Sequence, residues 1–406
     1  MTMKHGRVVF AGMLFIIACA MAVGLAAHNA DSFGTDSKAS AAVGPGSTSV
    51  ADNSKTNTAA PAVTDNSGTN TQAPAAASAV PSDTPPTAEP TEEVGAVPFE
   101  GFVYDLPDGY ETPTDRSGEI HEETYVTYLY DNEGNRGEKI EATLYVYTPV
   151  GYDPGRQYNI IYLMHGSGEV AGYWLGAGPY AEDGERYDSD DPMYTVNVLE
   201  HMIADGLCDG TIVVSPTFMD QFTDNDRFNG SSFDKLVRMS YQFRNDILPF
   251  VEGKYSTYAG GDVSDAGLIA SRDHRAYAGL SLGSLIGFRA IWMNCVEYFS
   301  YIGNFSGCDD DDGSLAYMVA EALNTRYAGY DIKYWYNGNG TYDHLHDDHA
   351  TGYAILLEQC PDKFTEGTDF ANGQNCIFVD KPGKGHTYES WIVDFYNVMS
   401  IFFKAG

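Results

Sequence analysis

The chain has 406 residues, of which 43% are hydrophobic and 13% aromatic, which is enough for one large hydrophobic core or two medium ones. Its formal net charge of −34 at pH 7 argues against binding to nucleic acid or to anionic membrane surfaces, because both repel an acidic protein. We interpret the charge as a source of solubility, and it identifies no substrate.

The first residues carry an export pattern. Lys4 and Arg7 precede residues 8–27, which are uncharged and mostly apolar. This pattern predicts a signal peptide over residues 1–27, or a membrane anchor if the segment is retained. Residues 16–19 also resemble a bacterial lipobox, which would make Cys19 a lipidated residue, but the run stays apolar beyond Cys19 and favours the other two readings. All three place the rest of the chain outside the cytoplasm, secreted or anchored at a bacterial cell surface.

Residues 28–96 are rich in Ala, Ser, Thr, Pro, Asn and Asp and have no apolar period. Such a segment buries too little surface to offset its conformational entropy, so it predicts a disordered linker. A folded domain is expected from Val97 to the end, over residues 97–406.

Strand and helix patterns alternate along this domain. We expect strands at 119–131, 139–148, 158–164, 211–215, 275–278, 301–305, 332–336 and 376–379. We expect helices at 196–204, 232–254 with a kink at Pro249, 282–296, 314–326, 348–359 and 388–403. This alternation predicts an α/β fold with a mostly parallel central sheet and helices on both faces. Ligands of such folds bind at the carboxyl ends of the strands.

The segment around Ser281 predicts a strand, a sharp turn and a helix. Residues 279–283 read Gly-Leu-Ser-Leu-Gly, the G-x-S-x-G pattern of a nucleophile elbow. We expect a strained turn that leaves no room for side chains at Gly279 and Gly283 and that lifts the Ser281 hydroxyl above the sheet. The turn also leaves the Leu282 N–H free at a helix start, where it can stabilise an oxyanion.

A nucleophilic serine needs a base and an orienting acid, and in α/β-hydrolases they follow in the order Ser, acid, His. His386 follows the last predicted strand and is the expected base. Asp343 follows the strand before it and is the expected acid, with Asp309 in the acidic run 309–312 as the alternative. We expect no metal, because the His and Asp residues at 344–349 match no metal-ligand spacing and are explained by an acidic helix N-terminus.

The loop after the strand at 158–164 is expected to complete the oxyanion hole. It reads His165-Gly166-Ser167-Gly168, and the Ser167 N–H is the candidate second donor. Trp174 lies in the next loop. It is expected either to form a substrate-binding wall for an aromatic or sugar group or to cover the hydrophobic core.

Five of the six cysteines follow the N-terminal segment, so at least one of them is unpaired. Cys360 and Cys376 bracket a polar loop, which makes them the first candidate for a disulfide, with Cys295 and Cys308 as the second. No C-x-x-C pattern is present, which argues against a zinc or redox site.

With these residues in place, the domain resembles carbohydrate esterase family 1, within the esterase D-like α/β-hydrolases, over residues 97–406. The resemblance is strongest for the feruloyl esterase modules of bacterial xylanases and is carried by residues 162–166, 244–252, 254–258, 271–277 and 279–283. It implies hydrolysis of hydroxycinnamoyl or acetyl esters on plant xylan, without a cofactor. It also implies that Ser281 is the nucleophile, His386 the base and Asp343 the orienting acid. The oxyanion donors that it implies are the backbone N–H groups of Ser167 and Leu282.

The chain departs from the family pattern at two positions near the expected site. Leu282 stands where the family elbow usually has Met. Glu169 stands in a loop that is glycine-rich in the family, and it would place a negative charge near the site, which bears on acyl specificity.

Three hypotheses about function follow. The first is an extracellular serine esterase that hydrolyses feruloyl or acetyl esters of xylan or xylo-oligosaccharides through an acyl-enzyme. The second is a broad carboxylesterase or an acyltransferase on envelope glycolipids. The third is a non-catalytic, surface glycan-binding module, which would need no Ser-Asp-His set.

Overall fold

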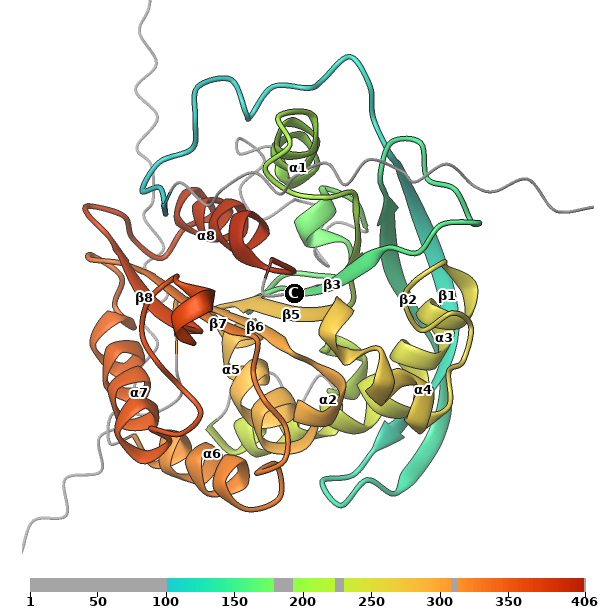
Figure 1. The fold of residues 1–406 in the computed structure, drawn as a ribbon. Coiled ribbons are helices and arrows are strands. Elements are labelled where there is room, and N and C mark those ends of the chain that lie inside the picture. Colours follow the sequence, from blue (N-terminus) through green and yellow to red (C-terminus); the bar gives the residue numbers. More distant parts are fainter. Residues whose placement is uncertain (1–100, 179–192, 223–229, 308–312, 405–406) are drawn as a thin grey trace, which may run out of the picture. The chain divides into compact units, whose positions relative to one another are not determined.

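The computed structural model describes residues 101–178, 193–222, 230–307 and 313–404 (Figure 1). All of them belong to one of the two units of the chain, Glu89–Gly406. The expected signal peptide or anchor (1–27), the linker (28–96) and the domain start at 97 lie outside the described residues. No helix among the described residues combines the length and apolarity that crossing a membrane requires.

A sheet of eight strands in the order β1-β2-β4-β3-β5-β6-β7-β8 forms the centre of the domain. Strand β1 runs antiparallel to β2, and β2 antiparallel to β4, whereas all other neighbours are parallel. The bounds are β1 Glu119–Tyr130, β2 Arg136–Thr148, β3 Asn159–Met164, β4 Thr211–Ser215, β5 Arg275–Leu280, β6 Tyr301–Phe305, β7 Tyr334–Gly340 and β8 Cys376–Lys381.

Helices cover both faces of this sheet, with α1 and α8 on one face and α2, α5, α6 and α7 on the other (Figure 1). The α-helices are α1 Thr195–Ala204, α2 Arg238–Gln242, α3 Leu248–Lys254, α4 Asp265–Ala270, α5 Leu282–Ile286, α6 Ser314–Asn324, α7 His346–Gln359 and α8 Tyr388–Ile401. Short 3₁₀ or π segments add Tyr173–Leu175, Met219–Gln221, Gly230–Val237, Phe243–Ile247, Arg272–His274, Gly287–Trp292, Val296–Tyr298 and Phe370–Asn372. The expected α/β-hydrolase architecture is thereby confirmed.

The central strands are mostly hydrophobic, and both of their faces are buried. All six residues of β3 are buried, and so are all six residues of β5. Their side chains divide between two hydrophobic cores, one on each face of the sheet. A continuous apolar run of this kind is the pattern of an interior parallel strand.

Two of the predicted helices are interrupted. The predicted helix over 232–254 is instead a 3₁₀ segment, α2, a π segment over Phe243–Ile247 and α3. Pro249 lies in the first turn of α3, where its missing N–H is tolerated, and the π segment widens the helix just before it. The predicted helix over 282–296 likewise continues from α5 into a π segment that ends at Trp292.

Strand β7 is longer than the predicted 332–336 because it includes polar residues that the sequence assigns to a loop. Asn337 and Asn339 are buried, and His349 of α7 hydrogen-bonds both side chains at 3.0 Å. Buried polar groups persist where such partners exist.

The expected Cys360–Cys376 disulfide is wrong, because both residues are free thiols buried against different neighbours. Cys360 Sγ lies 3.9 Å from the carbonyl oxygen of Ala320, whereas Cys376 Sγ lies 3.6 Å from the hydroxyl of Tyr353. Cys295 is also a free thiol, and its expected partner at position 308 lies outside the described residues.

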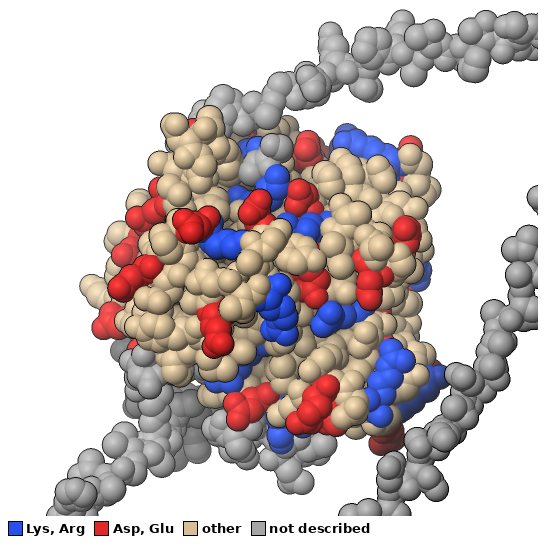
Figure 2. Space-filling model, turned by 60° about the horizontal axis from the view of Figure 1, so that its bottom comes forward, with Lys and Arg blue, Asp and Glu red and all other residues tan. Residues whose placement is uncertain are grey.

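Charged side chains of both signs are mixed on the face of the protein that Figure 2 shows. Lys and Arg side chains lie among Asp and Glu side chains there, without a continuous patch of either sign. This face therefore offers no extended acidic surface to a basic partner.

Candidate active site

The turn between β5 and α5 holds Ser281 in a strained conformation, with φ 50° and ψ −116°. Positive φ is costly for a residue with a Cβ atom and is found mainly where surrounding contacts enforce it. Here the Ser281 N–H donates to the carbonyl oxygen of Phe305 at 2.9 Å, which fixes the turn against β6. The serine therefore stands at the carboxyl end of β5, as the elbow pattern predicts.

The two glycines of the elbow are required by close backbone approaches. A Cβ atom on Gly279 would lie 2.4 Å from the carbonyl oxygen of Gly283, and one on Gly283 would lie 2.5 Å from the carbonyl oxygen of Met164 in β3. Both distances are far below van der Waals contact. The expectation that side chains do not fit at these positions is confirmed.

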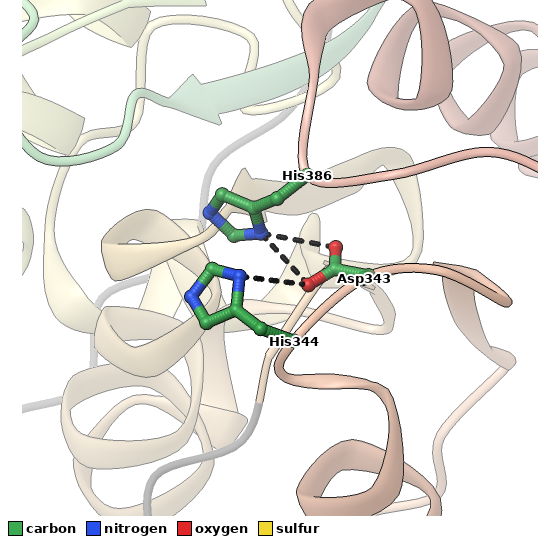
Figure 3. Close-up of side chains that lie close together, drawn as sticks. All are labelled: Asp343, His344 and His386. Carbon is green, nitrogen blue, oxygen red and sulfur yellow. Dashed lines mark hydrogen bonds and ion pairs between the residues drawn. The ribbon is translucent and has the colours of Figure 1, made fainter. Parts of the chain in front are cut away.

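Three side chains predicted from the sequence meet at this edge of the sheet. His386 Nε2 lies 2.9 Å from Ser281 Oγ, and His386 Nδ1 lies 2.9 and 3.0 Å from the two carboxylate oxygens of Asp343. His386 comes from the loop between β8 and α8, and Asp343 from the loop after β7 (Figure 3). With Ser281 after β5, three separate elements contribute. The geometry is that of a nucleophile, a base and an orienting acid.

The Asp343 carboxylate is buried and receives hydrogen bonds from several donors. Burial alone would raise its pKa, but hydrogen bonding and charge from His386, with smaller contributions from the Leu345 N–H and the Ser306 hydroxyl, lower the pKa to about 2. The Leu345 N–H donates to Oδ1 at 2.9 Å. Asp343 is therefore ionised at neutral pH and acts as an acceptor only.

Ser306 and Trp391 extend this hydrogen-bond chain behind the acid. The Trp391 indole N–H donates to Ser306 Oγ at 2.7 Å, so the Ser306 hydroxyl proton is free to point at Asp343. Ser306 has a positive φ of 54°, which marks a second strained position next to the site. Trp391 also packs edge-on against the His386 ring, with centroids 5.0 Å apart. Neither Ser306 nor Trp391 is marked by a sequence pattern that points to the site.

The acid and base loops are tied to each other by backbone hydrogen bonds. The Thr341 N–H donates to the Lys381 carbonyl oxygen at 3.0 Å, and the Tyr342 N–H donates to the Lys384 carbonyl oxygen at 2.9 Å. Lys381, at the end of β8, forms a fully buried ion pair with Asp394 of α8 at 2.5 Å. These contacts fix the separation of Asp343 and His386 from outside the site.

The loop after β3 lies against Ser281. His165 is buried and hydrogen-bonds Thr217 Oγ1 and the Gly166 carbonyl oxygen, each at 2.8 Å, and burial lowers its pKa to about 4. A Cβ atom on Gly166 would lie 3.2 Å from the Ser281 Cβ. The predicted oxyanion donors, the N–H groups of Ser167 and Leu282, have no hydrogen-bond acceptor in the part of the chain that the structure describes.

Glu169 lies in this loop, but its charge is suppressed at neutral pH. Its Oε2 accepts the Gly166 N–H at 2.5 Å. Burial raises the pKa of its carboxyl group to about 8, against the opposing effect of hydrogen bonds from Gly166 and Tyr173. The negative charge expected from the sequence is therefore mostly absent at pH 7.

Trp174 does not form a substrate wall. Its side chain is fully buried, donates its indole N–H to the Met164 carbonyl oxygen at 3.1 Å and packs against Phe305 and Phe395. A side chain with no exposed surface is out of reach of a substrate. The alternative expectation, a Trp that covers the core, is the one the structure supports.

The histidines near position 346 divide into different environments. His349 is buried, and burial lowers its pKa to about 3. His346 hydrogen-bonds Asp347 at 2.9 Å and Asp380 at 2.7 Å at the surface. Among the described residues, the group with metal-ligand proximity is Asp343, His344 and His386. The alternative acid, Asp309, lies outside the described residues.

Comparisons with known proteins agree with this fold. No protein-family model matches the chain. The chain is 32% identical over 301 residues to endo-1,4-beta-xylanase Y of Acetivibrio thermocellus, an alignment that covers 73% of this chain and 24% of the xylanase. The chain thus spans about a quarter of that relative's length.

Among solved structures, the chain resembles a serine-to-alanine mutant of the feruloyl esterase module from Clostridium thermocellum complexed with sinapinate. The TM-score is 0.60 at 28% identity, and the match covers 76% of this chain and 96% of the module. In sequence and fold the chain is thus similar to a feruloyl esterase module, in agreement with its resemblance to carbohydrate esterase family 1. The α/β fold described above is also the fold of that module. The ferulic acid esterase from Anaeromyces mucronatus shares that fold with a TM-score of 0.55 at 18% identity, over 75% of this chain and 98% of the esterase.

Proposed function

We propose that this protein is an extracellular serine esterase that hydrolyses feruloyl (hydroxycinnamoyl) or acetyl esters on plant xylan. The observation that carries the proposal is the continuous hydrogen-bond path from Ser281 Oγ through His386 to Asp343, with lengths of 2.9 to 3.0 Å. A glycan-binding module has no use for such a path.

In the proposed reaction His386 Nε2 takes the hydroxyl proton as Ser281 Oγ attacks the ester carbonyl carbon. Asp343 accepts the Nδ1–H throughout and stabilises the imidazolium that forms. The N–H groups of Ser167 and Leu282 are the proposed donors to the oxyanion, and loss of one such donor costs about 10²–10³ in rate. His386 then protonates the leaving sugar oxygen, and water hydrolyses the acyl-enzyme by the same steps in reverse.

Two relatives support the choice of substrate. One is a xylanase, and the other is a feruloyl esterase module complexed with sinapinate. A hydroxycinnamoyl ester on xylan or on a xylo-oligosaccharide is therefore the first substrate to test, with an acetyl ester as the second. Export is part of the proposal, and it rests on the charged start and apolar run of residues 1–27.

Hydrolysis of methyl ferulate and of 4-nitrophenyl acetate by the full-length chain tests the proposal, with Ser281→Ala as the blank. We expect a strong preference for ferulate. Activity on acetate alone would indicate an acetylxylan or general esterase. Activity that survives in Ser281→Ala would contradict the proposed mechanism. Activity on neither ester would also contradict it and would favour a transferase or a binding module.

A further inference from the structure

A second histidine stands beside the proposed base. His344 directly follows Asp343, and its ring lies edge-on to the His386 ring with centroids 4.6 Å apart. Figure 3 shows both imidazoles on one side of Asp343, each with Nδ1 directed at its carboxylate. His344 Nδ1 lies 3.7 Å from Asp343 Oδ1, and the His344 side chain is 70% exposed. One ligand atom from each of the three residues lies within 4.8 Å of the others.

Imidazole nitrogens and carboxylate oxygens are both ligands that zinc takes in proteins. In a tetrahedral site with bonds of about 2.0–2.2 Å, neighbouring ligand atoms lie about 3.4 Å apart. The distances from Asp343 Oδ1 to His386 Nδ1 (3.0 Å) and to His344 Nδ1 (3.7 Å) bracket that value. The remaining gap closes by rotation of His344, which its exposure permits.

We propose that Asp343, His344 and His386 form a site for a divalent transition-metal ion such as Zn²⁺, and that the bound ion inhibits the esterase. Three protein ligands leave a fourth position for water, so the ion does not need a partner beyond this chain. The binding stands on geometry alone, whereas the inhibition rests on the proposed function.

The inhibition follows from the tautomer of His386. In the free site Nδ1 carries the proton, which it donates to Asp343, and Nε2 is the acceptor that faces Ser281 Oγ at 2.9 Å. A metal ion on Nδ1 needs the lone pair of that nitrogen, so the proton of the neutral ring moves to Nε2. Nε2–H cannot accept the Ser281 proton, and the ion also takes the Asp343 oxygen that orients the ring.

Calorimetric titration of the full-length Ser281→Ala variant with ZnCl₂ tests the binding without any need for activity. This variant keeps all three ligands. We expect one bound ion per chain and at least a tenfold loss of affinity on adding His344→Ala. His346→Ala is the matched control, because His346 is a surface histidine two residues away with its own carboxylate neighbours, and it should leave this ion in place.

Ester hydrolysis at increasing ZnCl₂ tests the inhibition, expressed for each variant as a fraction of its own metal-free rate. We expect EDTA to restore the rate, and the inhibiting concentration to rise at least tenfold in His344→Ala but not in His346→Ala. Absence of binding in Ser281→Ala would overturn the site. Equal inhibition of the wild type and His344→Ala would overturn its link to catalysis. If no ester is hydrolysed, the proposed function fails while the calorimetry still decides the site.

Discussion

The partly buried carboxyl group of Glu169 makes the proposed activity sensitive to alkaline pH. Glu169 Oε2 accepts a hydrogen bond from the Gly166 N–H. A Cβ atom on Gly166 would lie 3.4 Å from Glu169 Oε2 and 3.2 Å from the Ser281 Cβ. Glu169 Oε2 is therefore at most about 7 Å from the Ser281 Cβ, and this value sets the scale of its separation from an oxyanion formed at Ser281. Its pKa of about 8 keeps it neutral through most of the neutral range. Ionisation adds a negative charge beside the developing oxyanion.

The size of the effect follows from that distance. Two negative charges about 7 Å apart repel by about 2.4 kcal/mol at an effective dielectric constant of about 20. This repulsion raises the transition state and corresponds to a loss of about 50-fold in rate, since 1.4 kcal/mol is a factor of ten. With a pKa of about 8, roughly nine in ten molecules carry the charge at pH 9. We therefore expect kcat/KM at pH 9 to be about tenfold below its value at pH 7.

Glu169→Gln isolates this charge, because the glutamine amide oxygen still accepts the Gly166 N–H but does not ionise. The assay is the pH profile of kcat/KM for a soluble ester between pH 6 and 10, corrected for spontaneous hydrolysis. We expect the variant to lose the alkaline decline and to match the wild type near pH 7. An alkaline decline of the same size in both proteins would refute the reasoning. A variant with much lower activity at pH 7 would show that the acid proton itself is required.

Four further predictions concern the site and its surroundings. Ser306→Ala should lower kcat/KM about tenfold, because a hydrogen bond to a charged group is worth about 1.5–3 kcal/mol. Ser306→Gly should have the same low kcat/KM but unfold at a higher urea concentration than Ser306→Ala, because glycine accepts the φ of 54°. Asp343→Asn should lower turnover by about 10⁴ with the fold intact by circular dichroism; a larger loss in Asp309→Asn would assign the acid to that residue instead. Ser281→Gly should lose turnover like Ser281→Ala but be more stable by about 1 kcal/mol in urea, because only the glycine accepts a φ of 50° without strain. The pKa of His349 falls to about 3 in the folded state, so the unfolded chain binds one more proton than the folded chain between about pH 6.5 and 3. The free energy of unfolding therefore decreases as pH falls through that window. His349→Gln should make the dependence of this free energy on pH shallower by about 1.4 kcal/mol per pH unit, and an unchanged dependence would show that His349 is not its source.

The site residues that the sequence predicts are those that directly follow a predicted strand. Ser281 is marked by flanking glycines that the backbone requires, and His386 and Asp343 follow from chain order, because successive parallel strands end at one edge of the sheet. The mostly parallel sheet follows from the alternation of apolar runs with helical periods. None of these inferences needs a contact between distant side chains.

The rest depends on contacts that no local pattern encodes. Ser306 and Trp391 are 85 positions apart and meet only because β6 and α8 pack together. The glycine-rich loop around Trp174 is compatible with a substrate contact, but the Trp174 ring is buried in the hydrophobic core. Cys360 and Cys376 have a suitable spacing in sequence, yet a disulfide depends on the direction of each side chain, and these two face different neighbours.

The polarity of the hydrogen bonds explains why residues outside the Ser-His-Asp set matter to its chemistry. An indole N–H only donates, so Trp391 makes the Ser306 oxygen an acceptor and leaves the Ser306 proton for Asp343. Asp343, ionised and surrounded by donors, can then accept only a proton-bearing Nδ1 from His386. That choice leaves Nε2 free to accept from Ser281, so a tryptophan without a titratable group helps to set the tautomer of the base. The same dependence makes the site vulnerable to an ion that replaces the Nδ1 proton.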